Sequence, residues 1–97
     1  MAEVLRWTSQ DSTLSLSGDL DRDSLLPFWQ QRKRLLAGKH VLDISALERV
    51  DSAGLALLAH VYQQQIRSQV PLLITGASER VKTLIGLYHL NEIIPVI

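Results

Sequence analysis

Two periods of apolar spacing alternate along this chain, and each predicts a different kind of element. Leu14 and Leu16 share one face of residues 13–18. The polar run 9–12 separates this segment from residues 4–7, which precede it in the sequence. This arrangement predicts two short strands in a hairpin. The short apolar segments 41–44 and 71–75 predict two further strands, buried beneath helices.

Helical spacing predicts three helices between and after these strands. We expect the first helix to be capped by Ser24, to carry Pro27 at its third position, and to end near Ala37 with Gly38 as its stop. The second helix follows Asp51, and its apolar positions predict a buried stripe of Leu55, Leu58, Ala59, Tyr62 and Ile66.

The third helix begins at a cap on Ser78, ends near Asn91, and repeats apolar residues at Val81, Leu84, Ile85 and Tyr88. Residues 93–97 form either an edge strand or a docked tail, because proline is excluded from a central ladder position. Strand and helix alternate in the second half, which implies right-handed crossovers between parallel strands. The expected fold is therefore α/β, a mixed sheet of four to five strands with helices packed on it, in a single domain of residues 1–97.

Composition and net charge indicate which kind of partner to expect. The 97 residues are 46% hydrophobic, enough for one modest core, and ten basic side chains balance ten acidic ones. A net charge of zero gives no reason to expect a nucleic-acid ligand or an anionic membrane surface. The first ten residues lack the apolar core of a signal peptide, and no run approaches the ~20 apolar residues that cross a bilayer. We therefore expect a cytoplasmic protein without membrane insertion, whose partners are proteins.

The start of the second helix is the candidate site. Asp51 is expected to cap the helix through its carboxylate, which places the Ser52 hydroxyl at the first helical position. Ala53 and Gly54 add little bulk beside that hydroxyl, so a partner surface or a kinase has room to approach it. The alternative is that these small residues only let the helix pack tightly against the sheet.

Catalysis is not expected from these residues. His60 follows Ser52 by eight positions on one helix, about 12 Å along the axis, and the serine lacks a G-x-S-x-G elbow. The three histidines lack the close spacing of a metal site, cysteine is absent, and no glycine-rich phosphate loop occurs. The sequence predicts a protein that is not an enzyme, with no catalytic residue, no metal and no cofactor.

The strand and turn at 14–21, the strand at 41–44 and the D-S-A-G-L helix start at 51–55 together resemble the STAS-domain family, the fold of anti-sigma-factor antagonists. Within that family, Trp7, the opening of the first helix with Trp29, and residues 54–58 are most similar to the small cytoplasmic STAS subunit of bacterial phospholipid ABC transporters of the Mla type. That subunit often carries threonine where this chain has Ser52.

The resemblance implies a non-enzymatic subunit that binds the ABC transporter ATPase and, through it, associates indirectly with the membrane permease. Such a complex lies at the inner membrane and maintains the lipid asymmetry of the outer membrane. The partner-binding residues expected here are Ser52, Asp51, Ala53, Trp29 and Arg49. Trp29 is included because the other apolar residues of the first helix already fill more than one helical stripe. Its ring therefore either faces outward, as an anchor for the partner, or widens the buried face of the helix. Arg49 is included for its nearness to Ser52.

An anti-sigma-factor antagonist is the alternative function. In that case a kinase phosphorylates Ser52, and the phosphate adds about −1.5 to −2 charges beside Asp51. Repulsion and bulk would then break the complex with the partner. Ser52→Glu would abolish binding and Ser52→Ala would preserve it, whereas a docking hydroxyl is weakened by Ser52→Ala.

Overall fold

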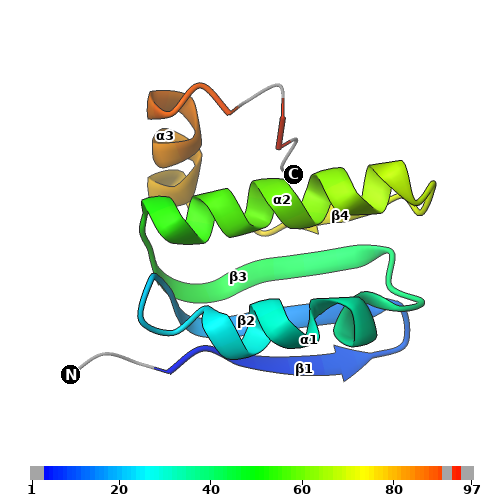
Figure 1. Cartoon of the computed structure of the whole chain (residues 1–97). Helices are drawn as coiled ribbons and strands as arrows, with labels where there is room; N and C mark the ends of the chain where they lie inside the picture. The colour runs from blue at the N-terminus through cyan, green and yellow to red at the C-terminus, as the bar shows by residue number, and fades with distance from the viewer. Residues whose placement is uncertain (1–3, 91–92, 95–97) are drawn as a thin grey trace.

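The computed structural model describes residues 4–90 and 93–94 of the chain. One four-stranded sheet has the order β1-β2-β3-β4, and Figure 1 shows α1 and α2 lying over one face of it, with α3 beside α2. The elements are β1 (Arg6–Gln10), β2 (Thr13–Leu20), α1 (Leu26–Leu36), β3 (Val41–Val50), α2 (Ser52–Arg67), β4 (Leu73–Thr75) and α3 (Glu79–Leu87). The α/β class and the mixed sheet are confirmed, with four strands in the described residues.

The opening hairpin forms as predicted, with shifted bounds. β1 pairs antiparallel with β2, and Gln10 lies opposite Thr13. Asp11 takes φ 53° in the turn, a left-handed conformation that aspartate tolerates better than most residues. The first strand runs from Arg6 to Gln10 instead of over residues 4–7, because the turn is tighter than the polar run suggested.

β3 extends well beyond the predicted residues 41–44. It runs parallel to both β2 and β4, and its pairing with β2 continues as far as Val50. β3 has 10 residues and β2 has 8. Two register shifts, between Ser15 and Ser17 and between Gly18 and Asp19, accommodate the additional residues of β3. The long β3 therefore ends beside the end of β2, and both strands deliver the chain to the same edge of the sheet.

Alternation along the strands sorts side chains between a buried face and an open one. Leu14, Leu16, Leu42 and Ile74 have no exposed surface, while their strand neighbours are at least partly exposed. Phe28 of α1 is equally buried and lies in the same core. Trp7 of β1 packs edge-on against Phe28, with ring centroids 5.7 Å apart. These contacts fix α1 across the first two strands.

The prediction that Ser24 caps α1 was wrong. The helix begins at Leu26 after Leu25, whose side chain supplies no capping hydrogen bond, and proline falls in the first two positions. Pro27, three residues after Ser24, has no N–H for the Ser24 hydroxyl to accept from. Asp21 forms a separate turn before the helix, in which its Oδ1 accepts hydrogen bonds from the backbone N–H groups of Asp23 and Ser24. The helix ends at Leu36, and Gly38 takes φ 75°, as expected of a helix stop.

The buried stripe of α2 was predicted only in part. Leu55 and Leu58 are buried as expected, and Val61 belongs with them. Ile66 was placed in the stripe wrongly, because 53% of its surface is exposed. Val61 is the last buried residue of α2, so the stripe ends about one turn before Ile66.

The third helix is capped as predicted, since the Ser78 hydroxyl accepts a hydrogen bond from the Val81 N–H at 3.2 Å. It ends at Leu87, and Tyr88, which was expected in its buried stripe, is 52% exposed. Asn91, the expected end, lies outside the described residues, as do residues 95–97 of the expected edge strand or tail. Ile94 is buried in the core after a turn and belongs to no strand.

Candidate functional site

The turn from β3 to α2 is held by the side chain of Asp51. Its backbone is extended, at φ −103° and ψ −174°, and its Oδ1 accepts a hydrogen bond from the Gly54 N–H at 2.9 Å. Oδ2 accepts a second hydrogen bond, from the Arg22 N–H at 3.1 Å. The predicted N-cap is therefore confirmed, and it also ties α2 to the turn after β2. Ser52 follows as the first residue of α2 with its side chain exposed.

Gly54 has a structural role that the sequence left open. A Cβ on this residue would lie 2.1 Å from the Leu20 carbonyl oxygen, so α2 rests directly on the backbone of β2. The same oxygen accepts a hydrogen bond from the Asp51 N–H at 3.3 Å. The absent side chain at Gly54 thus allows helix and sheet to meet, and it does not open the site to a partner. Ala53, by contrast, lies at the surface of the site.

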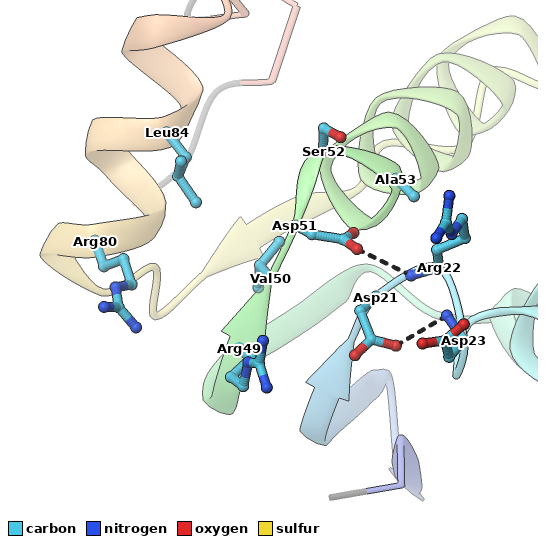
Figure 2. Close-up of a pocket in the computed structure, with 10 residues that line it drawn as sticks. All are labelled: Asp21, Arg22, Asp23, Arg49, Val50, Asp51, Ser52, Ala53, Arg80 and Leu84. Atoms are coloured by element: carbon cyan, nitrogen blue, oxygen red, sulfur yellow. Dashed lines mark hydrogen bonds between the residues drawn. The ribbon is translucent and has the colours of Figure 1, made fainter. Parts of the chain in front are cut away.

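A pocket of about 430 Å³ lies beside Ser52 (Figure 2). Four segments contribute to it: the turn after β2, the end of β3, the start of α2, and α3. The lining residues are Asp21, Arg22, Asp23, Arg49, Val50, Asp51, Ser52, Ala53, Arg80 and Leu84. Four of the five expected site residues, Arg49, Asp51, Ser52 and Ala53, therefore lie together.

Trp29 lies apart from this pocket, between α1 and α2. Its ring meets the His60 ring edge-on, with centroids 6.0 Å apart, and the Arg32 guanidinium carbon lies 3.7 Å from the ring centroid. Arg32 also donates hydrogen bonds to the Trp29 carbonyl at 2.7 Å and to Gln64 Oε1 at 3.0 Å. The indole is half-buried and joins the two helices. Its role as a partner anchor stays a prediction.

A second hollow connects Ser52 to His60 along the outer side of α2. It has a volume of about 310 Å³ and is bordered on the α3 side by Tyr88 and Leu90. Ser52 and His60 both line it, together with Ala56 and Ala59. Ser52 thus lies where two hollows meet, and His60 links the outer face of α2 to the Trp29 ring.

Asp21, Arg22, Asp23, Arg80 and Leu84 line the pocket and were not among the expected site residues. A signal existed for the first three, because side chains that follow neighbouring parallel strands gather at one edge of the sheet. Arg80 and Leu84 carry no such signal, because they are far from Ser52 in the sequence and come to the pocket only where α3 packs in the folded chain.

The groups around Ser52 suit binding. Both oxygens of the nearest carboxylate, Asp51, already accept backbone N–H groups, and no histidine or lysine is among the residues that line the 430 Å³ pocket. His60 lines the second hollow, eight residues after Ser52 on the same helix. Among residues 4–90 and 93–94, no cluster of three or more His, Asp or Glu side chains is placed to hold a metal. The same residues include no helix long and apolar enough to cross a membrane.

Comparison with known proteins supports the fold and points to a family. Residues 3–95 match the family described as "Mlab, STAS domain". The chain is 40% identical over 90 residues to the intermembrane phospholipid transport system binding protein MlaB of Escherichia coli K12, covering 93% of each chain. It is 31% identical over 99 residues to the protein of the same name from Haemophilus influenzae, covering 92% of this chain and 94% of that one.

A solved structure of an anti-sigma factor antagonist from Mycobacterium paratuberculosis superposes with a TM-score of 0.71, over 96% of this chain and 83% of that one. Sequence identity in this pair is 23%, so the likeness is one of fold.

Proposed function

This chain belongs to the STAS-domain family of the Mlab type, and from that premise we propose that it is the STAS subunit of a phospholipid ABC transporter. In this role its residues 1–97 act as a single domain that binds the ATPase subunit and supports its assembly and activity, without catalysing a reaction or using a cofactor. The relatives named as phospholipid transport system binding proteins support the system, and the resemblance of the helix start supports the ATPase as the partner.

The exposed Ser52 at the meeting point of two hollows is the observation that carries this proposal. We define the docking surface as Arg49, Ser52 and Ala53 at the pocket, continuing along α2 to His60 and Trp29. A hydroxyl here both donates and accepts a hydrogen bond, and the flanking alanine allows close approach. The half-buried Trp29, held by Arg32 and His60, is pre-ordered for contact, which lowers the entropy cost of binding.

Asp51 contributes to this surface indirectly. Because both of its carboxylate oxygens accept backbone N–H groups, its role is to hold Ser52 at the exposed start of α2. The binding energy gained at the docking surface then stabilises the assembled form of the ATPase by mass action. In this proposal the chain works in the cytoplasm, peripheral to the inner membrane, and meets the permease only through the ATPase.

An antagonist of an anti-sigma factor is the second candidate, and the exposed serine hydroxyl favours it. A kinase has access to Ser52, and a phosphate at this position would add about −1.5 to −2 charges beside Asp51. The added charge and bulk would then release the partner.

Isolation from the native cell distinguishes the two candidates. We would tag the chain, solubilise membranes gently, and identify its partners by mass spectrometry. Recovery of an ABC ATPase with its permease is the expected result. Recovery of a soluble serine kinase, with phosphate on Ser52, would overturn the transporter proposal in favour of the antagonist.

A further inference from the structure

Arginines from three separate segments line the pocket beside Ser52. Arg22 follows β2, Arg49 lies near the end of β3, and Arg80 is in the first turn of α3. All three side chains are exposed, and none of the three guanidinium groups makes a hydrogen bond or ion pair with another residue of the described chain. Figure 2 shows Arg49 and Arg80 on the side of the pocket toward α3, away from Arg22 and Asp23.

The carboxylates of the same pocket are largely committed to the backbone. Asp21 accepts hydrogen bonds from two N–H groups, at 2.9 and 3.1 Å, and Asp51 accepts two more, at 2.9 and 3.1 Å. Asp23 is left as the one lining carboxylate whose oxygens accept no hydrogen bond from a described residue. Formal charges in the lining cancel, and a carboxylate that accepts N–H groups keeps its charge. The charged donors still available to a ligand are the three guanidinium groups, while among the described residues the available charged acceptors are the Asp23 carboxylate and Asp21 Oδ2.

Two apolar residues line the pocket together with the two arginines on the α3 side. Val50 is 9% exposed and follows Arg49 directly, while Leu84 is half-buried one turn after Arg80. Planar guanidinium groups match carboxylates in geometry.

We propose that Arg49 and Arg80 together receive an acidic side chain of the partner, an aspartate or glutamate that enters the pocket while a neighbouring partner group contacts Ser52. This inference rests on the proposed function, since the partner is taken to be the ATPase, and it names the chemistry of the partner segment. Pairing with two arginines on different elements also fixes the angle at which that segment crosses the start of α2.

Charge reversal tests the proposal with the intact chain and the purified ATPase subunit of the same organism. Arg49→Glu and Arg80→Glu should each raise the Kd about tenfold or more, and added salt should weaken wild-type binding more than binding of the double variant. Arg67→Glu is the matched control, because Arg67 ends α2 at the far side from Ser52 and carries the same change of charge. Its Kd should stay within about threefold of wild type. Thermal melts followed by circular dichroism verify that each variant folds.

Cross-linking identifies the acidic side chain directly. Arg80→Lys keeps the charge and introduces an amine that a carbodiimide joins to a nearby carboxylate. The expected product links position 80 to an aspartate or glutamate of the ATPase, as mapped by mass spectrometry.

The outcomes separate this inference from the proposed function. If both reversals bind like Arg67→Glu while Ser52→Ala still weakens the complex, the acidic contact is wrong and the docking surface stands. If the wild-type chain does not bind the ATPase, both proposals are wrong.

Discussion

Replacing Gly54 with alanine tests how α2 is seated and, through it, how Ser52 is presented. The added Cβ would lie 2.1 Å from the Leu20 carbonyl oxygen and 3.0 Å from the Leu20 carbonyl carbon and Cγ. The obstacle is mainly backbone, and the strand that carries it is held by β1 on one side and β3 on the other. The start of α2 must therefore move away by about 1 Å, since the sheet cannot yield as a flexible side chain would.

The expected loss of stability follows from two opposing effects. Forcing extra volume into a packed contact costs roughly 1–3 kcal/mol, and a rigid backbone neighbour places Gly54→Ala toward the upper end. Alanine recovers at most about 1 kcal/mol through its better helix propensity. We expect a net loss of about 2 kcal/mol in the free energy of unfolding, which corresponds to a Tm lower by roughly 8–16 °C for a domain of this size.

Urea unfolding followed by circular dichroism measures this loss, with Gly38→Ala as the control. Gly38 has φ 75° and no atom within 4 Å of its added Cβ, so alanine there meets backbone strain without a clash. That variant should lose about 1 kcal/mol. A Gly54→Ala protein as stable as wild type would refute the reasoning, because α2 would then have room to accept the methyl group.

Two further substitutions test the same account. Asp51→Ala should lower the free energy of unfolding by about 1–2 kcal/mol, and Ser78→Ala should lower it by about 1 kcal/mol. The first loss is larger because two N–H groups lose their acceptor instead of one. Equal losses in urea titrations would contradict the double role of Asp51. Phe28→Ala should lower the free energy of unfolding by about 3–5 kcal/mol, because Phe28 is fully buried and packs against Trp7. Differential scanning calorimetry measures this loss. A loss below about 1 kcal/mol would mean that the core collapses around the gap, and would contradict the expectation.

Local sequence signals predicted the helix starts where the capping side chain acts on its own helix. Asp51 and Ser78 both satisfy the N–H group three residues later, as their positions suggested. The same reasoning was wrong at Ser24, because the residue three positions later is Pro27, which has no N–H to donate. Asp21 accepts hydrogen bonds from the N–H groups of Asp23 and Ser24 and forms a separate turn before α1. A capping residue type therefore predicts a helix start only where the matching N–H donor is present.

The full length of β3 could not be predicted from the pattern of apolar residues. β3 continues to Val50 through the exposed residues Ala46, Glu48 and Arg49, which break the apolar pattern. Ala46 and Arg49 still pair with β2, and Glu48 lies at the second register shift. Pairing depends on backbone groups, so a polar strand end leaves little trace in the residues. The core of the candidate site, from Arg49 to Ala53, was local and predictable, whereas Arg80 joins it only because α3 lies beside the end of β3.

The affinity of the purified chain for its ATPase subunit, compared between wild type and Ser52 variants, tests the central claim most directly. If the hydroxyl is a docking contact, Ser52→Ala should raise the Kd by about 2–13-fold, the equivalent of one hydrogen bond worth roughly 0.5–1.5 kcal/mol. Ser52→Thr keeps the hydroxyl and should bind nearly as wild type. Wild-type affinity in Ser52→Ala, with binding abolished in Ser52→Glu, would contradict the docking role and indicate a surface controlled by phosphorylation.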